Sequence, residues 1–341
     1  MRVDNIDATI AAAALDSRRR RSRLAFALRG GLGLALLALF LWLYGANRVV
    51  HVVSRERPVF FAATIALYLA GQVMSSYRWQ LLARLNGLGG PWREYLAYYF
   101  IGVFTNLFIP GLIGGDAARA SYLGLCHRRP GAALASVAAD RGIGLVALFW
   151  FAALAALAVT SARLPRSMLR LVMVIGLLAL LGYVVAPLLA RLVRRLTGRL
   201  GAIVQPLIPY LQNPVALIPA LALSLVLQAS LAVCQYLLAV GMGLKVPLSA
   251  VMLIVPIANV VASVPLTLNG LGLRESAYLL LFGIAGMAHQ DAVALGLLWF
   301  ASTLVAGLTG ILPFVLTPVP RPQDDSEDDS AERSAEASGL R

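Results

Sequence analysis

The stretch NLFIPGLIGGDAAR at residues 106–119 interrupts a long apolar segment with a proline, small residues and two charges. A second stretch, SVPLTLNGLGLRE at residues 263–275, repeats this order. In each, a glycine follows the proline by five residues and an arginine follows it by nine: Pro110, Gly115 and Arg119, then Pro265, Gly270 and Arg274. Unpaired backbone at membrane depth is tolerated only where it is buried in protein or lines a watery cavity. A matched pair of such segments therefore predicts a binding cavity of transporter type.

The composition surrounding these stretches is that of a membrane protein. The 341 residues are 60% apolar and 13% charged, and the mean hydropathy is +0.79. Soluble domains carry about 25% charged residues, so the composition excludes a soluble enzyme and a disordered chain. The net charge of +13 comes mostly from arginines between apolar runs, where they set topology and contact anionic headgroups. We expect no nucleic acid partner.

The apolar runs predict an all-α polytopic integral membrane protein with about 6–8 spanning helices, each of ~20 residues. The runs are 30–47, 59–77, 95–115, 142–162, 171–190, 200–244, 246–273 and 292–320. The predicted parts are a basic cytoplasmic N-terminus at 1–23, a flippase-like membrane domain at 24–318 with halves at about 59–160 and 214–318, and a disordered acidic tail at 319–341.

The two interrupted segments are predicted to form an inverted repeat. Three candidate spans lie between them, at 132–162, 171–190 and within 214–243. An odd number of crossings turns the second segment upside down relative to the first.

The positive-inside rule favours a re-entrant segment at 95–126, which keeps Arg78, Arg84 and Arg93 in inside loops with the group Arg191–Arg199. A full crossing by residues 95–115 is the alternative. It puts Arg191–Arg199 outside, against the rule. Either arrangement allows both termini to be cytoplasmic, and 246–288 leaves the same choice open.

Charged residues inside the membrane are costly and are candidates for function. They are Asp116 with Arg119, Asp140 with Arg141, and Arg274 with Glu275. A half-helix that begins in the membrane attracts an anion, and an arginine at its start suits a phosphate. We expect Arg119 and Arg274 to bind a headgroup phosphate, and Asp116 and Glu275 to cap half-helices, balance charge or contact a cationic headgroup.

The competing interpretation is that these charges only neutralise one another, for instance Arg119 with Asp140 or Arg274 with Asp116. Asp291 is interpreted as an interfacial loop residue. Interfacial positions are also predicted for the aromatic residues Trp42, Trp79, Trp92, Tyr44, Tyr77, Tyr95, Tyr98 and Tyr99. Cys126 and Cys234 form no CxxC pair, and no phosphate-binding loop occurs, so neither a metal nor another cofactor is expected.

Four strings carry a family resemblance: YRWQLLARLNGL (77–88), YYFIGVFTNLFIPGLIGGDAARASYL (98–123), ASVAADRGIGLVAL (135–148) and SVPLTLNGLGLRESAYLLLF (263–282). They resemble the flippase-like family named after the membrane region of lysylphosphatidylglycerol synthase. The resemblance implies a bacterial inner-membrane protein whose relatives move aminoacylated phosphatidylglycerol between leaflets. The site residues that it implies are Asn106, Pro110, Gly114, Gly115, Asp116, Arg119, Asp140, Arg141, Asn269, Gly270, Arg274 and Glu275.

We therefore expect a non-enzymatic lipid transporter whose substrate is an anionic or zwitterionic phosphate-headgroup lipid. Some relatives are associated with hopanoid or glycolipid pathways, so a glycolipid or isoprenoid lipid is also a candidate. Because the chain ends soon after its last span, we expect no synthase domain, and a homo-oligomer or a separate lipid synthase is a candidate partner. The alternative is a membrane enzyme, with Asp116 or Asp140 as general base, or an assembly factor for lipid-linked substrates.

Overall fold

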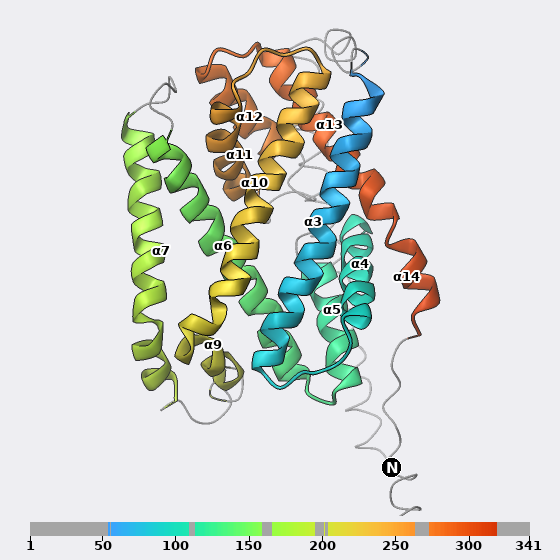
Figure 1. Cartoon of the computed structure of the whole chain (residues 1–341), viewed down its shortest axis with the longest axis vertical. Helices are drawn as coiled ribbons and strands as arrows, with labels where there is room; N and C mark the ends of the chain where they lie inside the picture. Colours follow the sequence, from blue (N-terminus) through green and yellow to red (C-terminus); the bar gives the residue numbers. More distant parts are fainter. Residues whose placement is uncertain are drawn as a thin grey trace, which may run out of the picture.

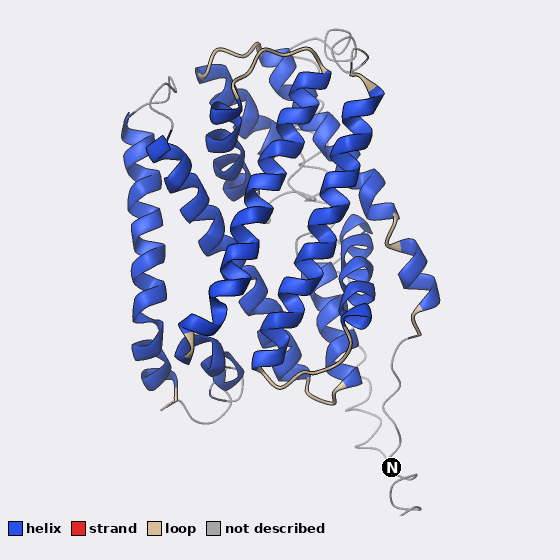
Figure 2. Ribbon diagram, viewed as in Figure 1, coloured by secondary structure: helices blue, strands red, loops and turns tan. Residues whose placement is uncertain are grey.

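The computed structural model describes residue 54 and residues 56–108, 113–158, 166–194, 201, 204–262 and 273–318. These residues form helices and no strand (Figures 1 and 2). The helices are α3 (Pro58–Leu85), α4 (Trp92–Phe108), α5 (Ile113–Cys126), α6 (Pro130–Ala158), α7 (Arg166–Val193), η1 (Gln205–Leu207), α9 (Ile208–Gln212), η2 (Pro214–Leu217), α10 (Ile218–Gly241), α11 (Leu248–Ala262), α12 (Leu273–Ile284), α13 (His289–Leu308) and α14 (Ile311–Leu316).

Among the described residues, five helical stretches are long and apolar enough to cross a membrane: Pro58–Leu85, Pro130–Leu157, Leu169–Arg191, Pro214–Gly241 and His289–Leu316. The prediction of an all-α polytopic membrane protein is confirmed. The first predicted span, at 30–47, and the termini at 1–23 and 319–341 lie outside the described residues.

The chain between α3 and α6 folds back on itself as a helical hairpin, here called hairpin 1 (α4 and α5). Its helices have 17 and 14 residues, about 25 and 21 Å, which is shorter than the ~30 Å hydrocarbon core. The ring centroids of Tyr98 and Tyr122 lie 5.3 Å apart with the rings tilted by 40°, and His127 Nε2 lies 3.1 Å from the Gly89 carbonyl oxygen. The hairpin thus enters and leaves at the lower end of Figure 1, which is the geometry of a re-entrant segment.

A second hairpin, hairpin 2 (α11 and α12), enters from the opposite end. Its helices have 15 and 12 residues and lie in the upper half of Figure 1. Between the hairpins the chain passes through three long helices, α6, α7 and α10. The order α3 to α6 is thereby repeated, upside down, by α10 to α13.

The ends of corresponding helices repeat as well. Both α3 and α10 close with the paired backbone hydrogen bonds of a Schellman motif, around Gly87 and Gly243, and so do α5 and α12, around Arg128 and Gly286. All four residues have positive φ, of 71°, 76°, 52° and 94° respectively. Glycine has no β-carbon to oppose this conformation, whereas Arg128 adopts it at a cost of about 1–2 kcal/mol. The matching caps support the inverted repeat independently of the interrupted segments.

Each half has its own apolar core. One cluster centres on Trp79 and Tyr95, where hairpin 1 packs on α3 and α6. The other centres on Tyr278 and Phe282, where hairpin 2 packs on α10 and α13. By contrast, α7 exposes large apolar side chains such as Leu177, as expected of a helix whose solvent is lipid.

Two predictions for the first half are wrong. Arg78 lies inside α3 and is 8% exposed, so it belongs to no loop. Trp79, Tyr95 and Tyr98, predicted at the interface, are 0%, 0% and 4% exposed. Both errors have one cause, because α3 continues to Leu85 as a single helix and hairpin 1 covers this face of it.

Candidate functional site

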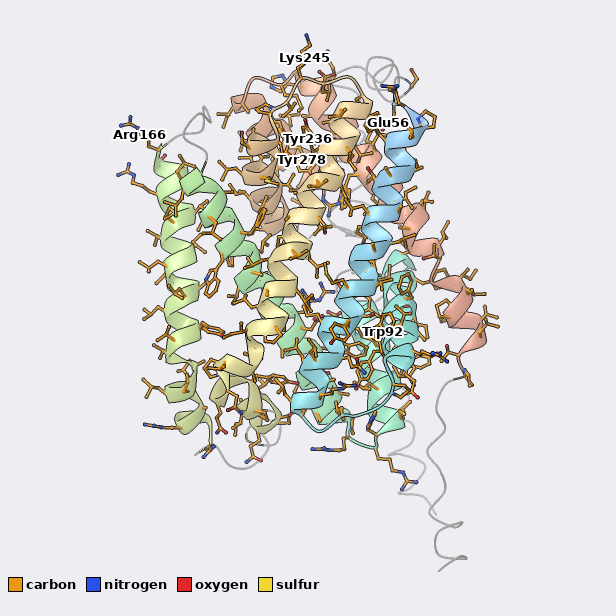
Figure 3. All side chains as sticks on the ribbon, in the orientation of Figure 1. Glu56, Trp92, Arg166, Tyr236, Lys245 and Tyr278 are labelled. Carbon is orange, nitrogen blue, oxygen red and sulfur yellow. The ribbon has the colours of Figure 1, made fainter. Side chains whose placement is uncertain are left out.

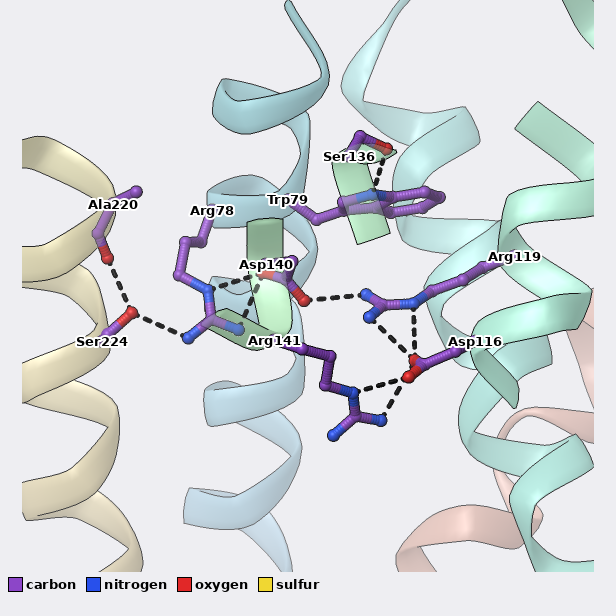
Figure 4. A network of polar contacts seen from close by, with 9 residues as sticks. All are labelled: Arg78, Trp79, Asp116, Arg119, Ser136, Asp140, Arg141, Ala220 and Ser224. Atoms are coloured by element: carbon purple, nitrogen blue, oxygen red, sulfur yellow. Dashed lines mark hydrogen bonds and ion pairs between the residues drawn. The ribbon is translucent and has the colours of Figure 1, made fainter. Parts of the chain in front are cut away.

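Alternating charges join three helices of the first half in one charge network, formed by Arg78, Asp116, Arg119, Asp140 and Arg141 (Figure 4). Asp140 of α6 accepts from Arg78 Nε of α3 at 2.8 Å on one oxygen and from Arg119 Nη1 of α5 at 3.0 Å on the other. Asp116 accepts from Arg119 Nε at 3.1 Å and from Arg141 Nε at 2.7 Å. Three guanidinium groups against two carboxylates leave the charge network with a formal charge of +1.

The charge network also reaches the second half. Arg78 Nη1 donates to the Ser224 hydroxyl of α10 at 2.8 Å, and Ser224 donates to the Ala220 carbonyl at 2.7 Å. Hairpin 1 is therefore tied through α6 and α3 to the helix that precedes hairpin 2.

Arg119 lies at the centre of the charge network and is fully enclosed. Its residue exposure is 3%. Its guanidinium lies 5.1 Å from the ring centroids of both Trp79 and Tyr99, within cation–π range. The Trp79 indole is held in turn by a 3.1 Å hydrogen bond to Ser136. Arg119 thus holds the network together, and a ligand would have to displace its partners to reach it.

Arg141 is the open end of the charge network. Its side chain is 42% exposed, against 18% for Asp116, 4% for Arg119 and 2% for Asp140. Its only ion-pair partner within the described part of the chain is Asp116. A guanidinium of this kind presents parallel N–H groups that suit a carboxylate or a phosphate.

The start of α5 is capped from α4. The Asn106 side chain accepts from the Gly115 backbone N–H at 2.7 Å, which satisfies a donor that the first turn leaves unpaired. Gly115 also packs so closely that a β-carbon there would lie 2.1 Å from the Gly102 carbonyl oxygen. Asn106 rather than Asp116 makes this capping bond, whereas Asp116 balances the charges of two arginines, which is another of the roles predicted for it.

In the second half, Arg274 and Glu275 begin α12. Glu275 is 0% exposed and packs on α13, where a β-carbon on Gly296 would lie 3.1 Å from its Oε1. Arg274 is half-buried, and none of the described carboxylates forms an ion pair with it. The hypothetical Arg274–Asp116 pair is therefore not formed, whereas the Arg119–Asp140 pair is.

The two halves also meet at Tyr68 of α3. The Tyr68 ring is fixed edge-on against Trp299 of α13, with the ring centroids 5.5 Å apart. This contact joins the first helix of one half to the helix that follows hairpin 2 in the other.

The predicted site residues fall into three groups. Those that meet at hairpin 1 and α6 are Asn106, Gly114, Gly115, Asp116, Arg119, Asp140 and Arg141. Those at the start of α12 are Arg274 and Glu275. Those outside the described residues are Pro110, Asn269 and Gly270.

Arg78, Ser224 and the aromatic residues that enclose Arg119 were not predicted as parts of the site. One signal was present for Arg78, since it follows an uncharged run from 59 to 77 and lies seven residues before the end of α3. Ending that span at residue 77 placed Arg78 in a loop. Ser224 carries no comparable signal, because serines are common in membrane helices.

Residues 26–310 match the protein family described as lysylphosphatidylglycerol synthase TM region. The chain belongs to this family. It is also similar to a UPF0104 membrane protein of Methanocaldococcus jannaschii, with 24% identity over 120 residues. That match covers 35% of this chain and 35% of the relative, so the chain spans about a third of the curated relative that it matches. No solved structure matches the chain.

Membership of the lysylphosphatidylglycerol synthase TM region family confirms the resemblance and the multi-pass membrane class. The whole charge network and both helices of hairpin 2, α11 and α12, lie within the matched residues.

Proposed function

We propose that the protein is a flippase-like transporter that moves a phosphate-headgroup lipid between membrane leaflets. The observation that carries the proposal is the exposed Arg141 at the open end of a buried network with a charge of +1. Two hairpins enter the helical bundle from opposite ends (Figure 1). Such opposed repeats are typical of proteins with alternating access to a central site.

The headgroup phosphate would take the place that Asp116 occupies on Arg141. Asp116 already holds this guanidinium through two bonds, from Nε at 2.7 Å and from Nη2 at 3.0 Å. Phosphate and carboxylate oxygens bind arginine in the same bidentate way. The acyl chains remain in the bilayer, beside apolar side chains such as those exposed by α7. Aminoacylated phosphatidylglycerol and glycolipid or isoprenoid phosphates fit this chemistry alike.

The proposal contains no covalent step. A general base must reach a substrate proton, yet both oxygens of Asp140 are engaged by arginines and the side chain is 2% exposed. A membrane enzyme thus has no described carboxylate in this network that is free to act. As partners we propose a separate synthase that supplies the lipid, or further copies of this chain in a homo-oligomer.

The lower end of the bundle is proposed to face the cytoplasm of a bacterial inner membrane. Its exposed basic residues are Arg84, Arg93, Arg128, Arg129, Arg191 and Arg194. The upper end, where Figure 3 labels Arg166 and Lys245, has four in the described part of the chain: Arg57, Arg166, Arg170 and Lys245. The positive-inside rule favours the more basic end. Cytoplasmic termini remain part of this proposal.

Leaflet exchange in liposomes tests the proposal. Purified protein is reconstituted with fluorescent phosphatidylglycerol, and the fraction of probe accessible to an external quencher is followed in time. We expect exchange with the wild type, and exchange at least tenfold slower with Arg141→Ala, since a charge-assisted bidentate contact is worth about 1.5–3 kcal/mol. Arg170→Ala, which removes an exposed arginine of α7 outside the network, is the matched control.

Arg141→Lys separates charge from geometry, because lysine keeps the charge but loses the bidentate fork. An intermediate rate is expected. Exchange by folded Arg141→Ala at the wild-type rate would contradict the proposed role of this residue.

A further inference from the structure

Two N–H donors in the second half are buried without an acceptor among the described residues. Gln235 of α10 is 0% exposed, and its Nε2 makes no hydrogen bond. The Nε of Arg274 in α12 is in the same situation. Folded proteins rarely leave such groups unsatisfied, because a buried donor without a partner loses its bonds to water and gains nothing in return.

The two donors lie beside the same tyrosine. The Tyr278 hydroxyl donates to Oε1 of Gln235, which fixes the amide and leaves Nε2 as its free side. Tyr278 follows Arg274 by four residues on α12, so the two share one face of that helix. Figure 3 shows Tyr278 in the upper half, close to the end where hairpin 2 enters.

The chemistry of these groups selects an anionic oxygen. An amide N–H and a guanidinium N–H are both donors, and together they carry one positive charge. A neutral carbonyl would satisfy the amide but would leave the guanidinium without a counter-charge. No described carboxylate forms an ion pair with Arg274, and Glu275 packs on Gly296 of α13. A metal ion is repelled by the same donor set.

We propose that Gln235 and Arg274, with Tyr278 orienting the amide, form a second oxyanion site that binds a phosphate oxygen. The inference rests on the proposed function in that a lipid headgroup would use Arg141 in one half and this second site in the other. The phosphate is either that of a lipid headgroup or free inorganic phosphate, and the test distinguishes the two sources.

The test measures binding on the full chain, purified in detergent and freed of lipid. One titration uses phosphatidylglycerol in mixed micelles and a second uses inorganic phosphate, with diacylglycerol as the uncharged comparison. Binding is followed by the shift of the thermal midpoint and by the number of lipids retained in native mass spectrometry. Saturable binding of phosphatidylglycerol alone identifies a lipid site, and binding of inorganic phosphate identifies a free-anion site.

Gln235→Glu is the decisive variant. It keeps the size of the side chain and the acceptor for Tyr278, but it replaces the free donor with a carboxylate that pairs with Arg274. We expect this internal anion to raise the thermal midpoint without ligand and to weaken phosphate binding at least tenfold. Arg274→Gln is expected to weaken binding similarly. Gln290→Glu, which adds the same charge near the start of α13, is the control and leaves binding unchanged.

The inference is overturned if the wild type binds neither phosphatidylglycerol nor inorganic phosphate. It is also overturned if Gln235→Glu and Arg274→Gln each bind the two probes with wild-type affinity. That result leaves the proposed function intact when wild-type liposomes still exchange lipid. Conversely, variant-sensitive binding without leaflet exchange upholds this site and refutes transport.

Discussion

The carboxylate of Asp116 accepts hydrogen bonds from the guanidinium of Arg141 on both oxygens. Oδ2 lies 2.7 Å from Nε, and Oδ1 lies 3.0 Å from Nη2. From its other side Asp116 is held by Arg119, whose Nη2 lies 2.9 Å away. Asp116 therefore sits on the exposed arginine as a phosphate would, while being anchored to a buried one. Asp116 neutralises Arg141 while leaving 42% of the Arg141 side chain exposed.

Asp116→Asn is expected to increase the affinity for anionic lipid severalfold. The change raises the formal charge of the network from +1 to +2 and removes the carboxylate that competes for Arg141. Because Arg119 loses a charged partner, the free energy of unfolding should fall by about 1–3 kcal/mol. The ratio of phosphatidylglycerol to phosphatidylcholine that co-purifies with the protein measures the first effect, and thermal unfolding measures the second. Lower retention of phosphatidylglycerol by the folded variant would refute the competition between Asp116 and phosphate.

Arg78→Leu is expected to destabilise the fold by about 3–5 kcal/mol, because it leaves the buried Asp140 with a single partner. The double variant Arg78→Leu/Asp140→Leu should recover part of this loss, since it removes the unpaired charge. Denaturant unfolding in detergent gives both values. Arg84→Ala, an exposed arginine on the same helix, should stay within about 0.5 kcal/mol of the wild type. An equal loss for Arg84→Ala would show that Arg78 has no special role in α3.

The architecture could be predicted from the sequence because surrounding lipid permits few backbone structures. Long apolar runs must be helices, and the equal spacing of Pro110–Arg119 and Pro265–Arg274 revealed two related segments. The odd number of spans between them then determined their opposite orientation. None of these inferences depends on which side chains touch.

The partners of the charges were harder to predict, because a sequence does not say how a hairpin packs. Arg119 was expected at a headgroup, but packing of hairpin 1 on α3 places it between Trp79 and Tyr99. Arg141 was a candidate site residue through the family resemblance, but its sequence position did not show that the turn of α6 exposes it. Adjacent residues on a helix point about 100° apart, so Asp140 faces the core while the side chain of Arg141 is 42% exposed.

Gly115→Ala should open hairpin 1. A β-carbon there would lie 2.1 Å from the backbone oxygen of Gly102 and 2.6 Å from the Asn106 amide nitrogen. Backbone at this distance can yield only if α4 and α5 separate, so we expect a loss of at least 1–3 kcal/mol in the free energy of unfolding together with loss of leaflet exchange. Gly182→Ala in α7 is the control, because no atom lies within 4 Å of its β-carbon position. That change should stabilise the helix by up to about 1 kcal/mol. Equal stability of the two variants would contradict the close contact.

The free energy of unfolding should also fall as the pH rises, because of Glu56, a carboxyl group that lies just before α3. Its carboxylate oxygens are buried without a partner among the described residues, and a β-carbon on Gly241 would lie 2.2 Å from one of them. Burial raises the pKa of Glu56 from 4.5 to about 7. Between these values the folded chain holds a proton that the unfolded chain has released, so the free energy of unfolding decreases with pH and levels off above about 7. Glu56→Gln lacks this titration. Its thermal midpoint should equal that of the wild type at pH 4 and exceed it at pH 8. If the difference between the two midpoints stays constant from pH 4 to pH 8, Glu56 is not buried as a protonated carboxyl.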